Sequence, residues 1–152
     1  DCADHIVTPA LERVVEANIL LSGLGFESAG LASAHSIHNG LMALEETHPH
    51  YHGEKVAFGV LAGLFLTNSS NQEIDTVYGF CRDVGLPTTL ADIGLKDAGP
   101  ERLMIAAERA CAEGQPIYHE EGDITPEKVL EAMIAADTEG RERILTDRPT
   151  ER

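Results

Sequence analysis

The sequence has few basic residues and no apolar run long enough to span a bilayer. Eleven Lys plus Arg stand against 26 Asp plus Glu, which leaves a net charge of -15 over 152 residues. A surface of this sign repels phosphate groups, so we expect no nucleic-acid partner and no binding to anionic membrane surfaces. The short apolar runs predict no membrane-spanning segment.

Cysteine is also scarce, and several common motifs are missing. The three cysteines, Cys2, Cys81 and Cys111, are odd in number and widely spaced, and no C-x-x-C occurs. This pattern argues against a disulfide framework and favours a reduced, cytoplasmic compartment. The sequence contains no G-x-G-x-x-G, no G-x-x-x-x-G-K-[ST] and no G-x-S-x-G. It therefore carries no familiar dinucleotide-binding, phosphate-binding or serine-nucleophile signature.

The long segments have apolar residues at helical spacing, and no run alternates as a strand would. At 43% hydrophobic residues, the chain fits one domain with a substantial core. The sequence predicts an all-α fold, an irregular bundle of six to seven helices. The expected helices run from Thr8 and Pro9 to Gly23 or Gly25, from Ser28 to about Leu44, through GEKVAFGVLAGLFL, around residues 74–81, from Pro100 to Gly114, and from Pro126 onward. The second of these is rich in Ala and Gly, so we expect it to be central and buried.

Five of the seven histidines lie in one stretch, AHSIHNGLMALEETHPHYHGE. His35 and His38 are three residues apart and share a helix face. His52 follows at the expected start of the next helix. Imidazole is a good ligand for Zn²⁺, so His35 and His52 form a candidate pair of metal ligands, although a catalytic zinc site takes about three protein ligands. The spacing alone leaves open a second interpretation, a polar loop beside one buried, hydrogen-bonded helix histidine.

Several motifs resemble the glycerol dehydrogenases of the iron-containing (group III) alcohol dehydrogenase superfamily. They are FESAGL from Phe26, AHSIHNGL, HGEKVAFG, VGLPTTLADIGL, AAERACAEG and ITPEKVLEAMIAAD. The resemblance implies a dehydroquinate synthase-like α-domain over residues 1–152, which is the C-terminal metal- and substrate-binding part of such an enzyme. The family's N-terminal nucleotide-binding domain, and the Asp that supplies the third zinc ligand, are absent from this chain.

The resemblance also implies roles for individual residues. His35 and His52 match zinc ligands, Phe26 matches an aromatic residue that lines the glycerol pocket, and His38 matches a position close to the active cleft, without an assigned role. His48 and His50 depart from the family's pattern, and we expect them to face solvent. The segment PIYHEEGD departs from it too, which leaves His119 without an implied function.

The implied reaction is oxidation of glycerol, or of another small vicinal diol, by a zinc-dependent and NAD-dependent dehydrogenase. In the family, Zn²⁺ binds two neighbouring hydroxyls and lowers the pKa of the alcohol, and hydride passes to NAD⁺ to give dihydroxyacetone. We expect this chain alone to be inactive, because it lacks NAD-binding elements, and to form homo-oligomers through exposed apolar surface. The alternative is a free-standing helical metal-binding or interaction module with its own zinc site, built from His48, His50 or Glu54.

Overall fold

The computed structural model describes residues 5–146, which form six α-helices and three short 3-10 helices and contain no strand. The prediction of an all-α fold is therefore confirmed. Cys2 lies outside the described residues. The chain divides into two compact units, one ending at Leu31 and the other beginning at Ala32.

The first unit is the single helix α1 (Pro9–Ala29) with its flanking residues. Thr8 caps it by accepting a hydrogen bond from the Leu11 N–H at 3.3 Å, and Pro9 occupies the first helical position, as expected. The helix ends at Gly30, whose φ of 73° lies in the region that favours glycine and whose N–H donates to the Phe26 carbonyl at 2.9 Å.

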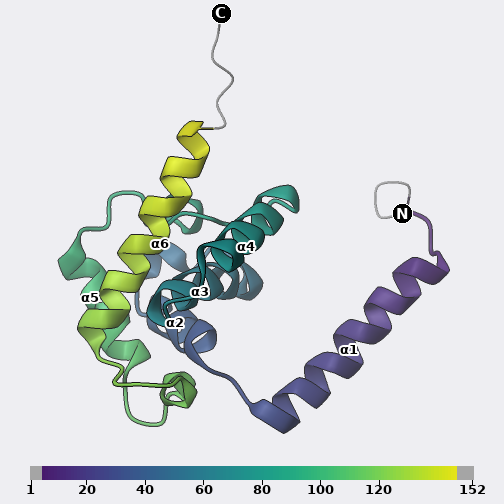
Figure 1. The fold of residues 1–152 in the computed structure, drawn as a ribbon, viewed down its shortest axis with the longest axis horizontal. Helices are drawn as coiled ribbons and strands as arrows, with labels where there is room; N and C mark the ends of the chain where they lie inside the picture. Colours follow the sequence, from purple (N-terminus) through teal and green to yellow (C-terminus); the bar gives the residue numbers. More distant parts are fainter. Residues whose placement is uncertain (1–4, 147–152) are drawn as a thin grey trace, which may run out of the picture. The chain divides into compact units, whose positions relative to one another are not determined.

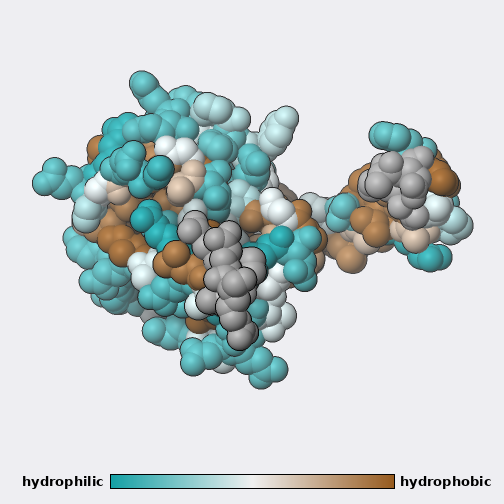
Figure 2. Space-filling model, turned by 90° about the horizontal axis from the view of Figure 1, so that it is seen from above, coloured by the Kyte–Doolittle hydropathy of each residue, from teal (hydrophilic) through white to brown (hydrophobic). Residues whose placement is uncertain are grey.

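The predicted end of this helix was wrong. Gly23 and Gly25 lie inside α1, and Ser28 belongs to α1 and does not cap a second helix. A glycine in a helix interior costs only about 1 kcal/mol, which good helix formers on either side can offset. Large apolar side chains of α1 are exposed, among them Ile19 at 73% and Phe26 at 61%, and Figure 2 shows this apolar surface in brown.

The second unit is built around α2 (Ser33–Leu41), which contacts α3 (His52–Leu66), α5 (Pro100–Ala110) and the 3-10 helix η3 (Pro116–His119). Helix α3 also packs against α4 (Asn71–Asp83) and α6 (Pro126–Thr146), and Figure 1 shows α6 running past both α3 and α5. The prediction that the Ala- and Gly-rich helix is central is confirmed, although it spans Ser33–Leu41 and does not begin at Ser28.

Small residues allow this central position. A Cβ added at Gly40 would stand 2.1 Å from the Ala106 carbonyl oxygen, so α2 and α5 meet backbone to backbone at this point. The remaining 3-10 helices are η1 (Glu45–Thr47) and η2 (Ala91–Ile93). The fully buried side chains that fill the core come from α2, α3, α4, α5 and α6 and the turns between them, and the largest are Tyr78, Phe58, Ile37, Leu41, Leu44, Leu61, Ile93, Leu95, Ile117 and Met133. Within residues 5–146, no helix combines the length and the apolar character that crossing a membrane requires.

Candidate metal centre

Three imidazoles from two helices come together in the second unit. His35 and His38 lie on α2, and His52 is the first residue of α3. The ring centres of His35 and His52 are 5.6 Å apart at an interplanar angle of 46°, and those of His38 and His52 are 4.3 Å apart at 69°. The structure thus brings together the two predicted ligands and places His38 beside one of them.

The separation of His35 and His52 suits a shared cation. Two imidazoles on one tetrahedral Zn²⁺, each with a nitrogen about 2.1 Å from the ion, have ring centres roughly 5 Å apart. His38 stands differently, because its Nε2 is 3.1 Å from Nδ1 of His52, which is hydrogen-bonding distance. The pair His35 and His52 therefore fits a metal ion, with His38 bonded to the second of them.

The centre is not complete within this part of the chain. Among residues 5–146, no group of three His, Cys, Asp or Glu side chains is arranged to hold a metal ion. A catalytic zinc ion takes about three protein ligands and keeps one open position. Two imidazoles would supply two of those ligands, fewer than such a site takes.

Burial favours the neutral, metal-binding form of the two α2 histidines. Desolvation, followed by the charge of the neighbouring His52, lowers the pKa of His35. Desolvation is also the largest cause of the lowered pKa of His38, and the hydrogen bond to Asn39 opposes it. Because a histidine must be deprotonated to bind a metal, the lowered pKa of His35 favours its metal-binding form.

The loop that leads to His52 is held by a buried lysine. Lys55 is only 3% exposed, and its ammonium donates to the carbonyl oxygens of Thr47 at 3.1 Å and His50 at 2.7 Å. The Thr47 hydroxyl, fully buried, lies 2.9 Å from the carbonyl oxygens of Leu41 and Leu44 at the end of α2. Charge-assisted hydrogen bonds of this kind are among the strong ones, so the first turn of α3 is tied to the end of α2 and fixes the position of His52.

The other end of α2 is held by Glu120, which follows η3. Its Oε1 accepts a hydrogen bond from the Ser33 N–H at 3.0 Å and another from the Ser33 hydroxyl. A carboxylate at a helix N-terminus satisfies a free N–H and interacts favourably with the helix dipole. The segment PIYHEEGD, which departs from the family's pattern, therefore orients the helix that carries His35 and His38.

The other histidines considered in the sequence analysis, and Phe26, lie outside this cluster of three imidazoles. His48 is exposed, as expected, and its Nε2 donates to the Met42 carbonyl at 3.0 Å. His50, expected to face solvent, is instead partly buried, because it packs beside Gly94, and its Nδ1 lies 3.8 Å from Glu54.

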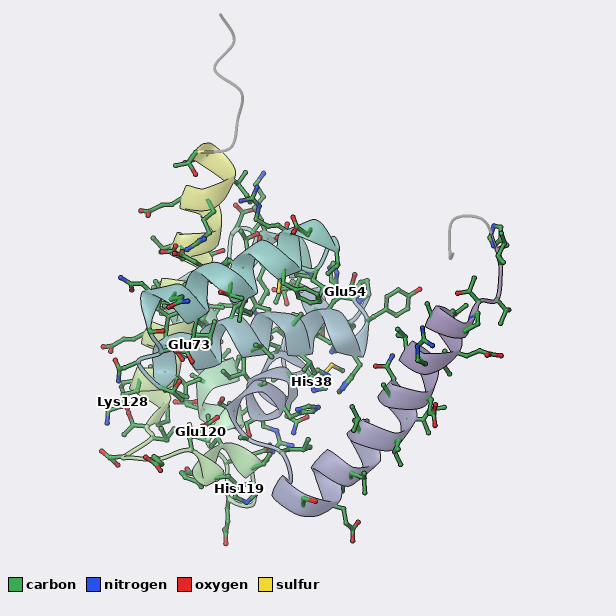
Figure 3. The ribbon with its side chains drawn as sticks, turned by 45° about the vertical axis from the view of Figure 1, so that its right-hand side comes forward. His38, Glu54, Glu73, His119, Glu120 and Lys128 are labelled. Carbon is green, nitrogen blue, oxygen red and sulfur yellow. The ribbon has the colours of Figure 1, made fainter. Side chains whose placement is uncertain are left out.

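His119 is exposed at the end of η3, some distance along the chain from the cluster, and Figure 3 labels it together with His38. Phe26 lies on α1, in the other unit.

Four residues that shape this centre escaped the sequence-based prediction: Asn39, Lys55, Gln115 and Glu120. For two of them, the local sequence offered a feature that could have drawn attention to the residue. Asn39 directly follows His38, and Lys55 is one of only two charged residues, with Glu54, in the otherwise apolar segment GEKVAFGVLAGLFL. Gln115 and Glu120 are 76 and 87 residues from their α2 partners, and no local pattern points to them.

Comparison with known proteins identifies relatives of this chain. A scan against protein-family models finds no match. The glycerol dehydrogenase of Thermotoga maritima is 59% identical over 137 residues, which are 90% of this chain and 38% of that protein. A solved structure of a probable glycerol dehydrogenase from Sinorhizobium meliloti has a TM-score of 0.88 and 48% identity, and covers 92% of this chain and 40% of that one. Glycerol dehydrogenase from Schizosaccharomyces pombe has a TM-score of 0.90 and 34% identity, over 97% of this chain and 38% of that one.

The chain therefore spans about two fifths of the length of the relatives that it matches. Sequence and fold agree over nearly all of this chain, and the agreement includes the segments that carry the three clustered histidines. The resemblance to the glycerol dehydrogenase family is confirmed: the chain is homologous to one part of those dehydrogenases.

Proposed function

We propose that this chain is the C-terminal helical part of a zinc-dependent and NAD-dependent glycerol dehydrogenase, in which His35 and His52 are two of the zinc ligands. The observation that carries the proposal is the meeting of these two rings, 5.6 Å between centres, from separate helices of a chain that is 59% identical to a glycerol dehydrogenase. Each ring alone would be unremarkable, since histidines often stack or hydrogen-bond at helix ends.

In this proposal, the residues of this chain hold the zinc ion and orient its ligands. His35 projects from the central helix α2, and His52 from the first turn of α3, where Lys55 fixes the preceding loop. Zn²⁺ held there would supply a Lewis acid that polarises an alcohol. The lowered pKa of His35 keeps that ring neutral, so no proton competes with the cation for its nitrogen near neutral pH.

The substrate in this proposal is glycerol or another small vicinal diol, and the family resemblance is the reason for proposing Phe26 as a substrate-binding residue. The remaining zinc ligand and the elements that bind NAD belong to the rest of the parent enzyme, since the relatives are more than twice as long as this chain. The parent is proposed to work in the cytoplasm, which is consistent with the free thiols of Cys81 and Cys111. The exposed apolar residues of α1 support assembly into homo-oligomers.

A chimera tests the function. The part of the Thermotoga maritima enzyme that matches this chain is replaced by the corresponding residues of this chain, and glycerol-dependent reduction of NAD⁺ is measured. We expect activity, and we expect His35→Ala and His52→Ala to lower kcat/KM by about 10³-fold or more, the several kcal/mol that a Lewis acid supplies. His48→Ala is the matched control and should change kcat/KM by less than about twofold.

The proposal fails if the folded chimera is active and His35→Ala and His52→Ala leave kcat/KM at the level of His48→Ala. The isolated chain gives a second test. It should bind zinc weakly and reduce no NAD⁺ with glycerol, because in this proposal it offers two imidazoles and the elements that bind NAD belong to the rest of the enzyme. A tight zinc site that persists in the double variant His35→Ala, His52→Ala would instead support the free-standing metal-binding module. Glu54 accepts a hydrogen bond from the Tyr51 N–H at 2.6 Å and so already closes the N-terminus of α3, which speaks against that module.

A further inference from the structure

A chain of side-chain hydrogen bonds runs from the turn after α5 to the candidate metal centre. Asn39 Nδ2 donates to Gln115 Oε1 at 2.9 Å. Asn39 Oδ1 lies 3.1 Å from His38 Nδ1, and His38 Nε2 lies 3.1 Å from His52 Nδ1. All the groups except His52 are partly buried, which limits competition from water.

The orientation of the Asn39 amide determines which ring nitrogen carries the proton in His38 and in His52. The Asn39 amide uses its nitrogen on Gln115, so its oxygen faces His38, and an amide oxygen only accepts. Nδ1 of His38 therefore carries the proton. A neutral imidazole has one N–H, which leaves Nε2 of His38 as an acceptor. The proton between the two rings then belongs to Nδ1 of His52, and Nε2 of His52 keeps a free electron pair.

We propose that Asn39 and His38 are positioning residues that fix His52 in its Nδ1–H tautomer and thereby present its Nε2 to a metal cation. This inference rests on the proposed role of His52 as a zinc ligand. A metal-binding histidine almost always donates its other ring N–H to a fixed partner, which sets both its tautomer and its orientation. Here that partner is a second imidazole, and its own proton is set by an amide.

The ring geometry supports this arrangement. The rings of His38 and His52 are inclined at 69° with their centres 4.3 Å apart, and Nε2 of His38 lies 3.1 Å from Nδ1 of His52. His35 makes a different approach to the same ring, at 46° and 5.6 Å. His52 thus has one neighbour within hydrogen-bonding reach and another at the distance expected for a shared cation. Figure 3 shows His38 on α2 beneath the N-terminal end of α3.

The tautomer can be read directly from ring ¹⁵N resonances of the metal-free chain at a pH of about 8, which is above the ordinary pKa of an imidazole. We expect His52 Nδ1 to resonate as a protonated nitrogen and Nε2 as an unprotonated one, the reverse of the form that histidine favours in water. His38→Leu and Asn39→Leu should each shift His52 towards the Nε2–H form. His38→Gln should restore the wild-type pattern, because its amide oxygen can accept from Nδ1. His48→Leu is the control and should leave His52 unchanged.

Zinc titration, followed on the same resonances, supplies the second readout. His38→Leu should weaken zinc binding at His52 by about 10–100-fold, the usual effect of removing such a partner, and His38→Gln should recover most of it. Circular dichroism establishes that each variant keeps its helix content, so that a loss of fold is recognised as such.

The two proposals fail separately. If zinc leaves the His35 and His52 resonances of the wild-type chain unmoved, and the ligand variants of the chimera are fully active, the proposed zinc ligation is wrong. If zinc binds these rings but His52 carries its proton on Nε2, or its tautomer is the same in His38→Leu as in wild type, the positioning role of His38 is wrong.

Discussion

Gly59 of α3 lies directly against the backbone of Ala34 on α2, so that a Cβ at residue 59 would stand 2.4 Å from the Ala34 carbonyl oxygen. This contact lies next to His35 in sequence and joins the two helices that carry the candidate ligands. The close approach of α2 and α3 at Gly59 is therefore part of what brings His35 and His52 together.

Gly59→Ala should lower the free energy of unfolding by about 3 kcal/mol, because backbone atoms cannot yield to an added methyl group as a flexible side chain can. Urea denaturation measures this loss. Gly79→Ala on α4 is the matched control, since a Cβ there meets no atom within 4 Å. It should raise stability by up to about 1 kcal/mol through helix propensity. Equal effects of the two substitutions would contradict the close contact.

Lys55→Met should destabilise the fold by about 2–3 kcal/mol. The substitution keeps the apolar stem but removes the ammonium that donates to the carbonyl oxygens of Thr47 and His50, which then lie unsatisfied. Chemical denaturation measures the loss, and broadening of the His52 ring resonances should report the loosened loop. Lys96→Met, at an exposed position, should change stability by no more than about 0.5 kcal/mol. A stable Lys55→Met protein with a sharp His52 signal would show that the lysine does not anchor the loop.

Ser36→Ala should stabilise the chain by about 1 kcal/mol. The Ser36 side-chain oxygen is fully buried and has no hydrogen-bond partner in the described part of the chain. Its removal relieves a desolvation cost and replaces serine by a better helix former. The contrasting variant is Ser70→Ala, which removes the cap that accepts from the Glu73 N–H at 3.3 Å and should cost about 1 kcal/mol. Thermal unfolding of the two variants should therefore shift in opposite directions, and a lower midpoint for Ser36→Ala would refute the prediction.

Stability should fall as pH rises above about 10, in part through Tyr78. Burial raises the pKa of this phenol, whose hydroxyl donates to the Ala136 carbonyl at 2.7 Å. The folded chain therefore holds the proton more tightly than the unfolded chain, so the contribution is present below the unfolded pKa and is lost as the pH increases past it. Tyr78→Phe should cost about 1 kcal/mol at neutral pH and flatten the alkaline decline. Tyr51→Phe, 81% exposed, should do neither. Parallel pH profiles for all three proteins would rule out this role of Tyr78.

Sequence reasoning located most helices because their starting signals are local. Thr8 with Pro9, Pro100 and Pro126 each begin a helix where the sequence predicted one. The boundary between the first two helices was misplaced, because glycine weakens a helix without having to end it, and only Gly30 adopts the positive φ that closes α1.

The sequence by itself determined the all-helical fold and, through its motifs, the family and the candidate pair His35 and His52. These follow from short-range patterns, which depend only on residues that are close together in the sequence. Only the tertiary structure decided that His38 bonds to His52, that Gln115 orients Asn39, and that Glu120 holds the start of α2. Those contacts join residues 14 to 87 positions apart, and their distances depend on how the helices pack rather than on the spacing of the residues along the chain.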